Sequence, residues 1–208
     1  MSKTLFLWDV ARTLFVEEWN SELTGYPDYP SYVVGIGKDP NNPRVFEESY
    51  QETYLKGEMF NLALMPGYAE VLGACAHNEI FTTGVKEQME WRAQYLNPKV
   101  GFDIRKFFQK INTSFDFAPT NVKTQEMLTE YLRQKVADGY GTVVYTDDKL
   151  ANGEFFRAAA EEIKKEYPSF SYRFYHILND NGGIRPKGWY QAIGGLRDVI
   201  TSEKQLGG

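Results

Sequence analysis

An apolar segment near the start of the chain, ending in a single carboxylate, constrains the possible folds more than any other feature. Residues 4–8 are Thr-Leu-Phe-Leu-Trp, and Asp9 follows them at the start of a turn-like stretch closed by Thr13. An apolar run of this length predicts a buried strand with Asp9 at its carboxyl end, where open α/β sheets bind ligands. A helix cap or a turn residue would produce the same local pattern, so the role of Asp9 has to be inferred from motifs further along the chain.

Composition and charge narrow the classes of partner. The 208 residues are 42% hydrophobic and 25% charged, which suits one globular domain with room for an insertion. The net charge of −5 and the lack of a Lys/Arg run argue against nucleic-acid binding. Residues 5–8 are too short for a signal peptide, and no apolar stretch reaches the ~20 residues of a membrane helix. Cys75 is the only cysteine, so no intrachain disulfide is expected, and the two histidines lack metal-ligand spacing, so zinc is not expected. Together with the lack of a membrane segment, this predicts a cytoplasmic protein without a membrane partner.

Strands and helices alternate along most of the chain. Apolar and β-branched runs predict strands over residues 79–84, 142–146 and 170–178. Helical periodicity and end signals predict helices over residues 65–77, 86–95, 124–138 and 154–167. Residues 102–117 predict a helix and a brief strand. This alternation predicts a parallel sheet with right-handed crossovers.

Residues 16–64 interrupt the alternation with a concentration of glycine, proline and aromatic residues. Phe46, Tyr50 and Tyr54 recur at spacings of four, which predicts a helix with one aromatic face over Phe46–Phe60. We therefore expect a loop-rich, partly helical insertion outside the sheet. The core domain would then comprise residues 1–15 and 65–208.

Two polar positions follow predicted strands or precede predicted helices in the core. Thr83 and Gly84 end the strand over residues 79–84, where a hydroxyl and a free amide can hold a phosphate oxygen. Alternation places Thr82 on the other face, which favours Thr83, although Thr83 could simply cap the next helix. Lys123 stands just before a helix, where the helix dipole disfavours a cation, so a nearby anion is expected unless Lys123 is an ordinary exposed lysine.

The strand over residues 142–146 leads into two adjacent carboxylates, Asp147 and Asp148. Like charges this close raise each other's pKa, so the arrangement predicts a bound cation. Asn152 follows at a fixed spacing in the pattern Asp-Asp-x-x-x-Asn.

These four segments, in this order, resemble the motifs of the haloacid dehalogenase (HAD) superfamily. Its first motif is Asp-x-Asp-Gly-Thr-Leu, which Asp9, Thr13 and Leu14 match and which Ala11 and Arg12 do not. The resemblance implies an α/β fold with a doubly wound, Rossmann-like parallel sheet. It also implies that residues 16–64 form a small, mostly helical cap of the first type, covering the site.

The resemblance further implies a Mg²⁺-dependent phosphatase acting on a small phosphorylated molecule. Asp9 would be the nucleophile that forms an aspartyl-phosphate. The metal ligands would be Asp9, the Ala11 carbonyl and Asp148. Thr83, the Gly84 amide and Lys123 would bind the phosphoryl group, and Asp147 would orient Lys123 or a water molecule.

Ala11 departs from the motif, because HAD phosphatases carry there the aspartate that protonates the leaving alcohol. Three interpretations remain. The chain could be a phosphatase for esters with good leaving groups, such as acyl or aryl phosphates. It could be a phosphonatase-like C–P hydrolase, since that branch has Asp-x-Ala and Thr-Thr-Gly, and the Schiff-base lysine would be Lys38 or Lys56. It could also be a non-catalytic binding protein that keeps the metal site.

Overall fold

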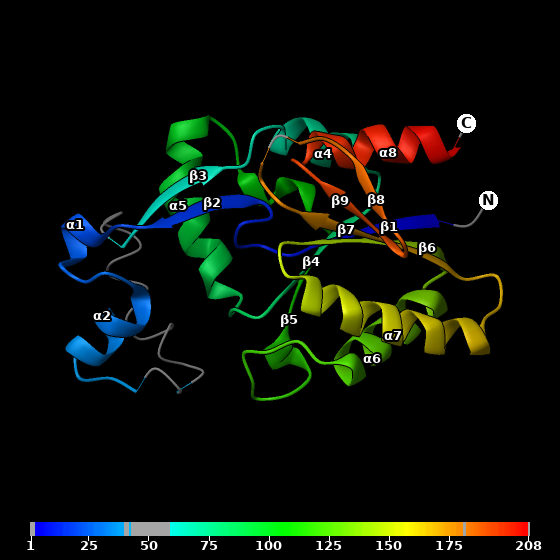
Figure 1. The fold of residues 1–208 in the computed structure, drawn as a ribbon, viewed down its shortest axis with the longest axis horizontal. Helices are drawn as coiled ribbons and strands as arrows, with labels where there is room; N and C mark the ends of the chain where they lie inside the picture. The colour runs from blue at the N-terminus through cyan, green and yellow to red at the C-terminus, as the bar shows by residue number, and fades with distance from the viewer. Residues whose placement is uncertain (1–2, 40–41, 43–58, 181, 208) are drawn as a thin grey trace.

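The computed structural model describes residues 3–39, 42, 59–180 and 182–207, and its centre is a seven-stranded sheet (Figure 1). Its strand order is β5-β4-β1-β6-β7-β9-β8. In that order the strands are β5 (Lys110–Thr113), β4 (Asn78–Thr82), β1 (Lys3–Trp8), β6 (Tyr140–Asp147), β7 (Ser171–Ile177), β9 (Tyr190–Ile193) and β8 (Arg185–Lys187). All neighbouring strands pair in parallel except β8 and β9, which are antiparallel. The parallel sheet expected from the sequence is confirmed, with one antiparallel edge strand.

Helices cover both faces of this sheet (Figure 1). One face packs against α4 (Tyr68–Ala74), α5 (Glu87–Val100) and α8 (Arg197–Gly207), and the other against α6 (Gln125–Ala137) and α7 (Leu150–Glu166). Strand β1 shows how the sequence produces two cores, because alternate side chains point to opposite faces. Leu5 and Leu7 are buried with α6 and α7, whereas Trp8 is buried with the helices of the other face. The fold is therefore a doubly wound, Rossmann-like α/β fold.

The insertion contains sheet, which corrects the expectation that residues 16–64 lie outside any sheet. Strands β2 (Phe15–Trp19) and β3 (Phe60–Leu64) form a separate two-stranded antiparallel sheet at one end of the molecule (Figure 1). Short helices α1 (Ser21–Thr24) and α2 (Tyr29–Gly35) follow β2. The sequence pattern missed these strands because tertiary aromatic packing stabilises them: the ring of Trp19 contacts those of Tyr29, Tyr32 and Phe60. Of the predicted helix over residues 46–60, residues 46–58 lie outside the described residues, and Phe60 belongs to β3.

Several predicted boundaries also differ from the structure. Strands β8 and β9 were not expected, because three- and four-residue strands are too short to show a period. Helix α7 begins at Leu150 rather than residue 154, and α5 continues to Val100. Residues 102–117 form 3₁₀ helices at Ile104–Phe107 and Ser114–Asp116 on either side of β5. No helix in the described part of the chain is long and apolar enough to cross a membrane.

Candidate functional site

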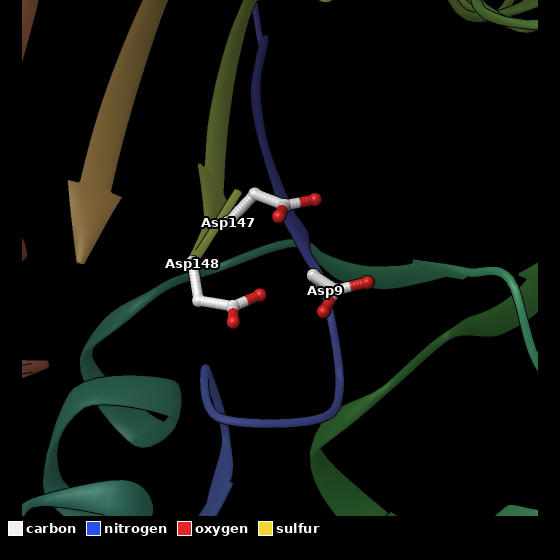
Figure 2. A group of neighbouring side chains, drawn as sticks. All are labelled: Asp9, Asp147 and Asp148. Atoms are coloured by element: carbon white, nitrogen blue, oxygen red, sulfur yellow. The ribbon is translucent and has the colours of Figure 1, made fainter. Parts of the chain in front are cut away.

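The carboxyl ends of β1 and β6 lie side by side at the point where the strand order reverses. From β1 the chain continues to β4 and β5 on one side, and then crosses to β6 on the other side of β1. This topological switch point is where open α/β sheets bind ligands. Asp9 follows β1, Asp147 is the last residue of β6, and Asp148 comes next. Figure 2 shows the three aspartates gathered at this edge.

Lys123, in the segment just before α6, contacts two of these aspartates. Its Nζ donates to Asp9 Oδ1 at 2.5 Å, to Asp147 Oδ2 at 2.8 Å and to the Tyr145 hydroxyl at 2.7 Å. The Lys123 side chain is 0% exposed, which excludes the alternative of an ordinary surface lysine. Lys123 directly precedes Thr124, whose hydroxyl caps α6, so the helix start sets its position. The expected anionic partners of Lys123 are therefore present.

Asp147 accepts four hydrogen bonds from the protein. Besides Lys123, its Oδ2 accepts from Asn152 Nδ2 at 2.9 Å and from the Tyr145 hydroxyl, and its Oδ1 accepts the Lys149 backbone N–H at 2.8 Å. Asp147 thus holds Lys123 in place, and its Oδ2 accepts three of these bonds while its Oδ1 accepts one. Sequence reasoning included Asn152 but missed Tyr145. The signal was present, since Tyr145 and Asp147 are two apart on β6 and project to the same side.

Asp148 differs from its neighbour because no described residue donates a hydrogen bond to its half-buried carboxylate. One oxygen from each of Asp9, Asp147 and Asp148 lies within 4.8 Å of the others. Opposite ligands of an octahedral Mg²⁺ are separated by about 4.2 Å, so a small adjustment would bring these oxygens to ligand spacing. Asp9 and Asp147 face the Lys123 ammonium, whereas the charges of Lys149 and Arg12 lower the pKa of Asp148 against the larger, opposing effect of its burial. The donor set consists of hard oxygen atoms, and it therefore fits a small divalent cation.

The electrostatics of the cluster follow from burial and from these neighbours. Burial raises the pKa of Asp9 to about 7, against the opposing attraction of Lys123. Burial and the adjacent charge of Asp147 raise the pKa of Asp148. The pKa of Asp147 is lowered, because the attraction and hydrogen bond of Lys123 outweigh the effect of its burial. The pKa of Lys123 is raised, since the two carboxylates outweigh its desolvation. A cation near Asp9 and Asp148 would favour the ionised form of both.

Two adjoining cavities open at this edge of the sheet. The inner cavity, of about 220 Å³, is lined by Asp9, Ala11, Arg12, Thr82, Thr83, Asp148, Lys149 and Asn152. The outer cavity, of about 380 Å³, shares Ala11, Arg12, Thr82, Thr83 and Lys149 with the inner one. Its remaining lining residues are Glu17, Tyr29, Phe60, Gly84, Val85, Gln88, Arg92, Phe115 and Asn121. The inner cavity is thus polar and acidic at its base, whereas the outer cavity is bounded by aromatic side chains of the insertion and the core.

The threonines after β4 both line the inner cavity, which corrects the expectation that Thr82 faces away. Thr82 ends β4 and is buried, whereas Thr83 lies beyond the strand and is half-buried, so strand alternation no longer governs it. The Gly84 N–H donates weakly to Thr82 Oγ1, at 3.4 Å. Thr83 does not cap the following helix, because the residue at the cap position of α5 is Lys86. Thr83 lines the inner cavity, and Gly84 lines the outer one.

Ala11, which stands where the resembled motif has its second aspartate, lines both cavities. Of the two lysines proposed for a Schiff base, Lys38 follows α2 and lines neither cavity, and Lys56 lies outside the described residues. The sequence analysis assigned no role to Arg12 or Lys149. The available signal was Arg12 itself, which stands where the resembled motif has glycine.

Comparison with known proteins identifies no family. No family model matches the chain, and no curated protein matches its sequence. Among solved structures, the fold is similar to the crystal structure of the UTR4 protein (unknown transcript 4 protein) from Saccharomyces cerevisiae. The two share 14% sequence identity over 94% of this chain and 98% of that chain, with a TM-score of 0.54. At this identity the likeness shows a shared α/β fold and nothing about activity.

Proposed function

We propose that this chain is a HAD-like hydrolase that transfers the phosphoryl group of a small phosphate ester to Asp9 and then to water. One observation carries the proposal: Lys123 Nζ binds Asp9 and Asp147 together at the switch point of the sheet. These residues come from three motifs that resemble the HAD pattern and are separated by up to 138 positions. Because they meet in one buried cluster, we favour a shared catalytic role for the three residues rather than a separate structural role for each.

In the proposed reaction, Asp9 attacks phosphorus through the carboxylate oxygen that Lys123 does not occupy. Lys123 neutralises charge on the transferring group, and Asp147 keeps Lys123 oriented. Thr83 and the Gly84 amide bind phosphoryl oxygens at the cavity wall. Water then attacks the phosphorus of the aspartyl-phosphate, which releases inorganic phosphate and regenerates Asp9.

The residues that would hold Mg²⁺ are Asp9, Asp148 and the carbonyl of Ala11, because Asp147 already accepts four hydrogen bonds that hold Lys123 and the start of α7. When bound, this ion supplies charge neutralisation for the phosphoryl oxygens. We include a cytoplasmic location in the proposal, since the single, buried Cys75 suits a reducing compartment.

Ala11 restricts the substrates that such an enzyme can use. A positioned acid contributes about 10²–10⁴ in rate, mostly for leaving groups that need a proton. Without it, alkyl phosphates should react slowly, and acyl or aryl phosphates should react faster. The phosphonatase-like alternative receives no support from Lys38, which lines neither cavity. The non-catalytic alternative predicts a bound cation without turnover.

The test is phosphate release from aryl and alkyl phosphates, with Mg²⁺ or with EDTA, by the natural chain and by Asp9→Asn. We expect Mg²⁺-dependent release that Asp9→Asn abolishes, and a phosphorylated Asp9 that is trapped by acid quench and found by mass spectrometry. Ala11→Asp should then increase alkyl phosphate turnover by up to about 10²–10⁴ and change aryl phosphate turnover little. Turnover that survives in Asp9→Asn would overturn the proposal. Cation binding with no turnover on any ester would favour the non-catalytic alternative.

A further inference from the structure

The two cavities place two cations at the position where the ester bond would break. Asp9 lines only the inner cavity, so the phosphoryl group it attacks belongs there. The organic part of the substrate then extends into the outer cavity, which is the one bounded by Tyr29 and Phe60. The leaving oxygen must lie between the two, where both cavities are lined by the same residues. Arg12 and Lys149 are the charged residues of that shared wall.

The backbone of Arg12 is held in a conformation that arginine disfavours. Its φ is +57°, in the left-handed region that glycine adopts without penalty. Two hydrogen bonds fix this geometry: the Arg12 N–H donates to the Phe15 carbonyl at 2.9 Å, and Asn179 Nδ2 donates to the Arg12 carbonyl at 2.7 Å. Asn179 is itself left-handed, with a φ of +55°. A strained residue fixed from both sides beside a reactive centre indicates a function for its side chain.

The Arg12 guanidinium also has charge to offer to a ligand. It is exposed at the cavity wall and forms no salt bridge with a carboxylate of the described residues, although its charge lowers the pKa of Asp148 against the larger effect of burial. The contrast within the outer cavity is Arg92, which is buried and paired with Glu17. Lys149 also has no ion pair with a described residue, but its backbone carries no comparable strain. Of the two cations on the shared wall, Arg12 is therefore the one whose backbone is held in a strained conformation.

We propose that Arg12 is a catalytic residue that binds the leaving oxygen in place of the acid that Ala11 cannot supply, which makes the enzyme selective for aryl phosphates. This inference rests on the phosphoryl transfer proposed above. As Asp9 bonds to phosphorus, the phosphorus–oxygen ester bond breaks and its electron pair stays on the leaving oxygen. Arg12 stabilises that oxyanion by a charge-assisted hydrogen bond and keeps its own protons, because guanidinium does not titrate in proteins. The proton that the oxyanion finally takes up comes from water at the open rim.

The first experiment measures how turnover depends on the leaving group. Phenyl phosphates that carry a graded series of ring substituents are compared for the natural chain, Arg12→Gln, Arg12→Lys and Arg12→Gly. We expect Arg12→Gln and Arg12→Gly to lose up to about 10²-fold in kcat on the least acidic phenol, by analogy with the loss of one oxyanion donor, and clearly less on 4-nitrophenol. The dependence on phenol acidity should therefore become steeper. Arg12→Lys should recover part of the loss.

Arg12→Gly also separates a catalytic role from a structural one. It removes the guanidinium but relieves the left-handed strain, so its melting temperature should equal or exceed that of the natural chain. Arg133→Gln, on α6 and paired with Glu166, serves as the control for loss of a surface cation and should leave the series unchanged. Equal losses across all phenols in Arg12→Gln would overturn the proposal, because such losses indicate binding of the phosphoryl group rather than of the leaving oxygen.

The second experiment needs no turnover and so distinguishes failure of this inference from failure of the proposed function. 4-Nitrophenol is titrated spectroscopically with Asp9→Asn and with Asp9→Asn/Arg12→Gln, both in the presence of Mg²⁺ and inorganic phosphate. Beside Arg12 the bound phenol should ionise at a lower pH than in solution, and the double variant should abolish this shift. A phenol that does not bind, or that ionises alike in both proteins, overturns the role of Arg12. A shift without any turnover by the natural chain keeps the contact between Arg12 and the phenolate but rejects the hydrolase, and with it the catalytic role of Arg12.

Discussion

Replacing Lys123 with methionine tests the central feature of the site, because it removes one charge and leaves two buried carboxylates facing each other. Methionine has a similar length and is apolar, so the change deletes three hydrogen bonds without opening a large cavity. The side chains of Lys123 and Asp147 are both 0% exposed, and that of Asp9 is 11% exposed. Solvent therefore cannot replace the lost interactions.

Removing one partner of a buried ion pair costs about 3–5 kcal/mol of folding free energy, and we expect a loss of this size in Lys123→Met. For a chain of this length, 1 kcal/mol changes the melting temperature by about 2–4 °C, so Lys123→Met should lower it by roughly 6–20 °C. The loss should depend on pH. Without Lys123, the pKa values of Asp9 and Asp147 rise, so the folded state takes up protons that the unfolded state does not. The deficit should therefore be large at pH 8 and shrink as the pH falls toward 5.

The assay is thermal unfolding followed by circular dichroism between pH 5 and 8, in EDTA and in Mg²⁺. Lys135→Met is the matched control, because Lys135 is equally buried and pairs with Glu79 at 2.7 Å outside the site. Both variants should be destabilised in EDTA. Mg²⁺ should recover part of the loss in Lys123→Met and none in Lys135→Met. A decrease under about 3 °C that does not vary with pH would refute the reasoning.

Three further predictions follow from the geometry. Millimolar Mg²⁺ should raise the melting temperature of the natural chain by mass action, and Asp148→Asn should reduce the rise; an equal rise in both proteins would contradict the assigned ligand. Burial raises the pKa of Asp9 to about 7, whereas its pKa in the unfolded chain is near 3.9. Between these two pH values the folded state binds a proton that the unfolded state does not. The free energy of unfolding without metal should therefore fall as the pH rises through this window. Asp9→Asn should remove that fall, and parallel pH profiles for the two proteins would exclude the raised pKa. Gly153→Ala should lower the melting temperature, although alanine has the better helix propensity, because a Cβ there would lie 2.1 Å from the Phe174 ring. Gly195→Ala is the control, because a Cβ at that position would have no atom within 4 Å. Similar changes in melting temperature at both positions would contradict the packing.

The local sequence determined most of the fold. The continuous apolar run over residues 5–8 predicts a buried strand, and the structure places Leu5 and Leu7 in one core and Trp8 in the other. The helix predicted over residues 124–138 is observed as Gln125–Ala137, and it is followed by a left-handed Gly139, the residue expected to close it. These features are predictable because they depend on backbone preferences and periodicity within one element.

The elements that the sequence did not predict depend on strand pairing rather than on a pattern within one element. Strands β2 and β3 are 40 residues apart and exist because they pair with each other and because Trp19 packs against nearby rings. Strands β8 and β9 have three and four residues, so their pairing rather than their pattern defines them. The partner of β2 therefore lies far outside any local window, whereas β8 pairs with its sequence neighbour β9, which also pairs with the more distant β7.

The candidate site divides in the same way. Sequence motifs singled out Asp9, Lys123, Asp147 and Asp148 as chemically unusual, because each carries a charge at the end of a strand or the start of a helix. Only the strand order places β1 beside β6, and only that neighbourhood brings Lys123 Nζ to Asp9, 114 residues away. The left-handed turn at Arg12 and the cavity wall it shares with Lys149 also depend on tertiary structure, through Asn179 at 167 residues' distance. A sequence pattern specifies which groups are present at element ends, whereas chain topology decides which of those groups meet.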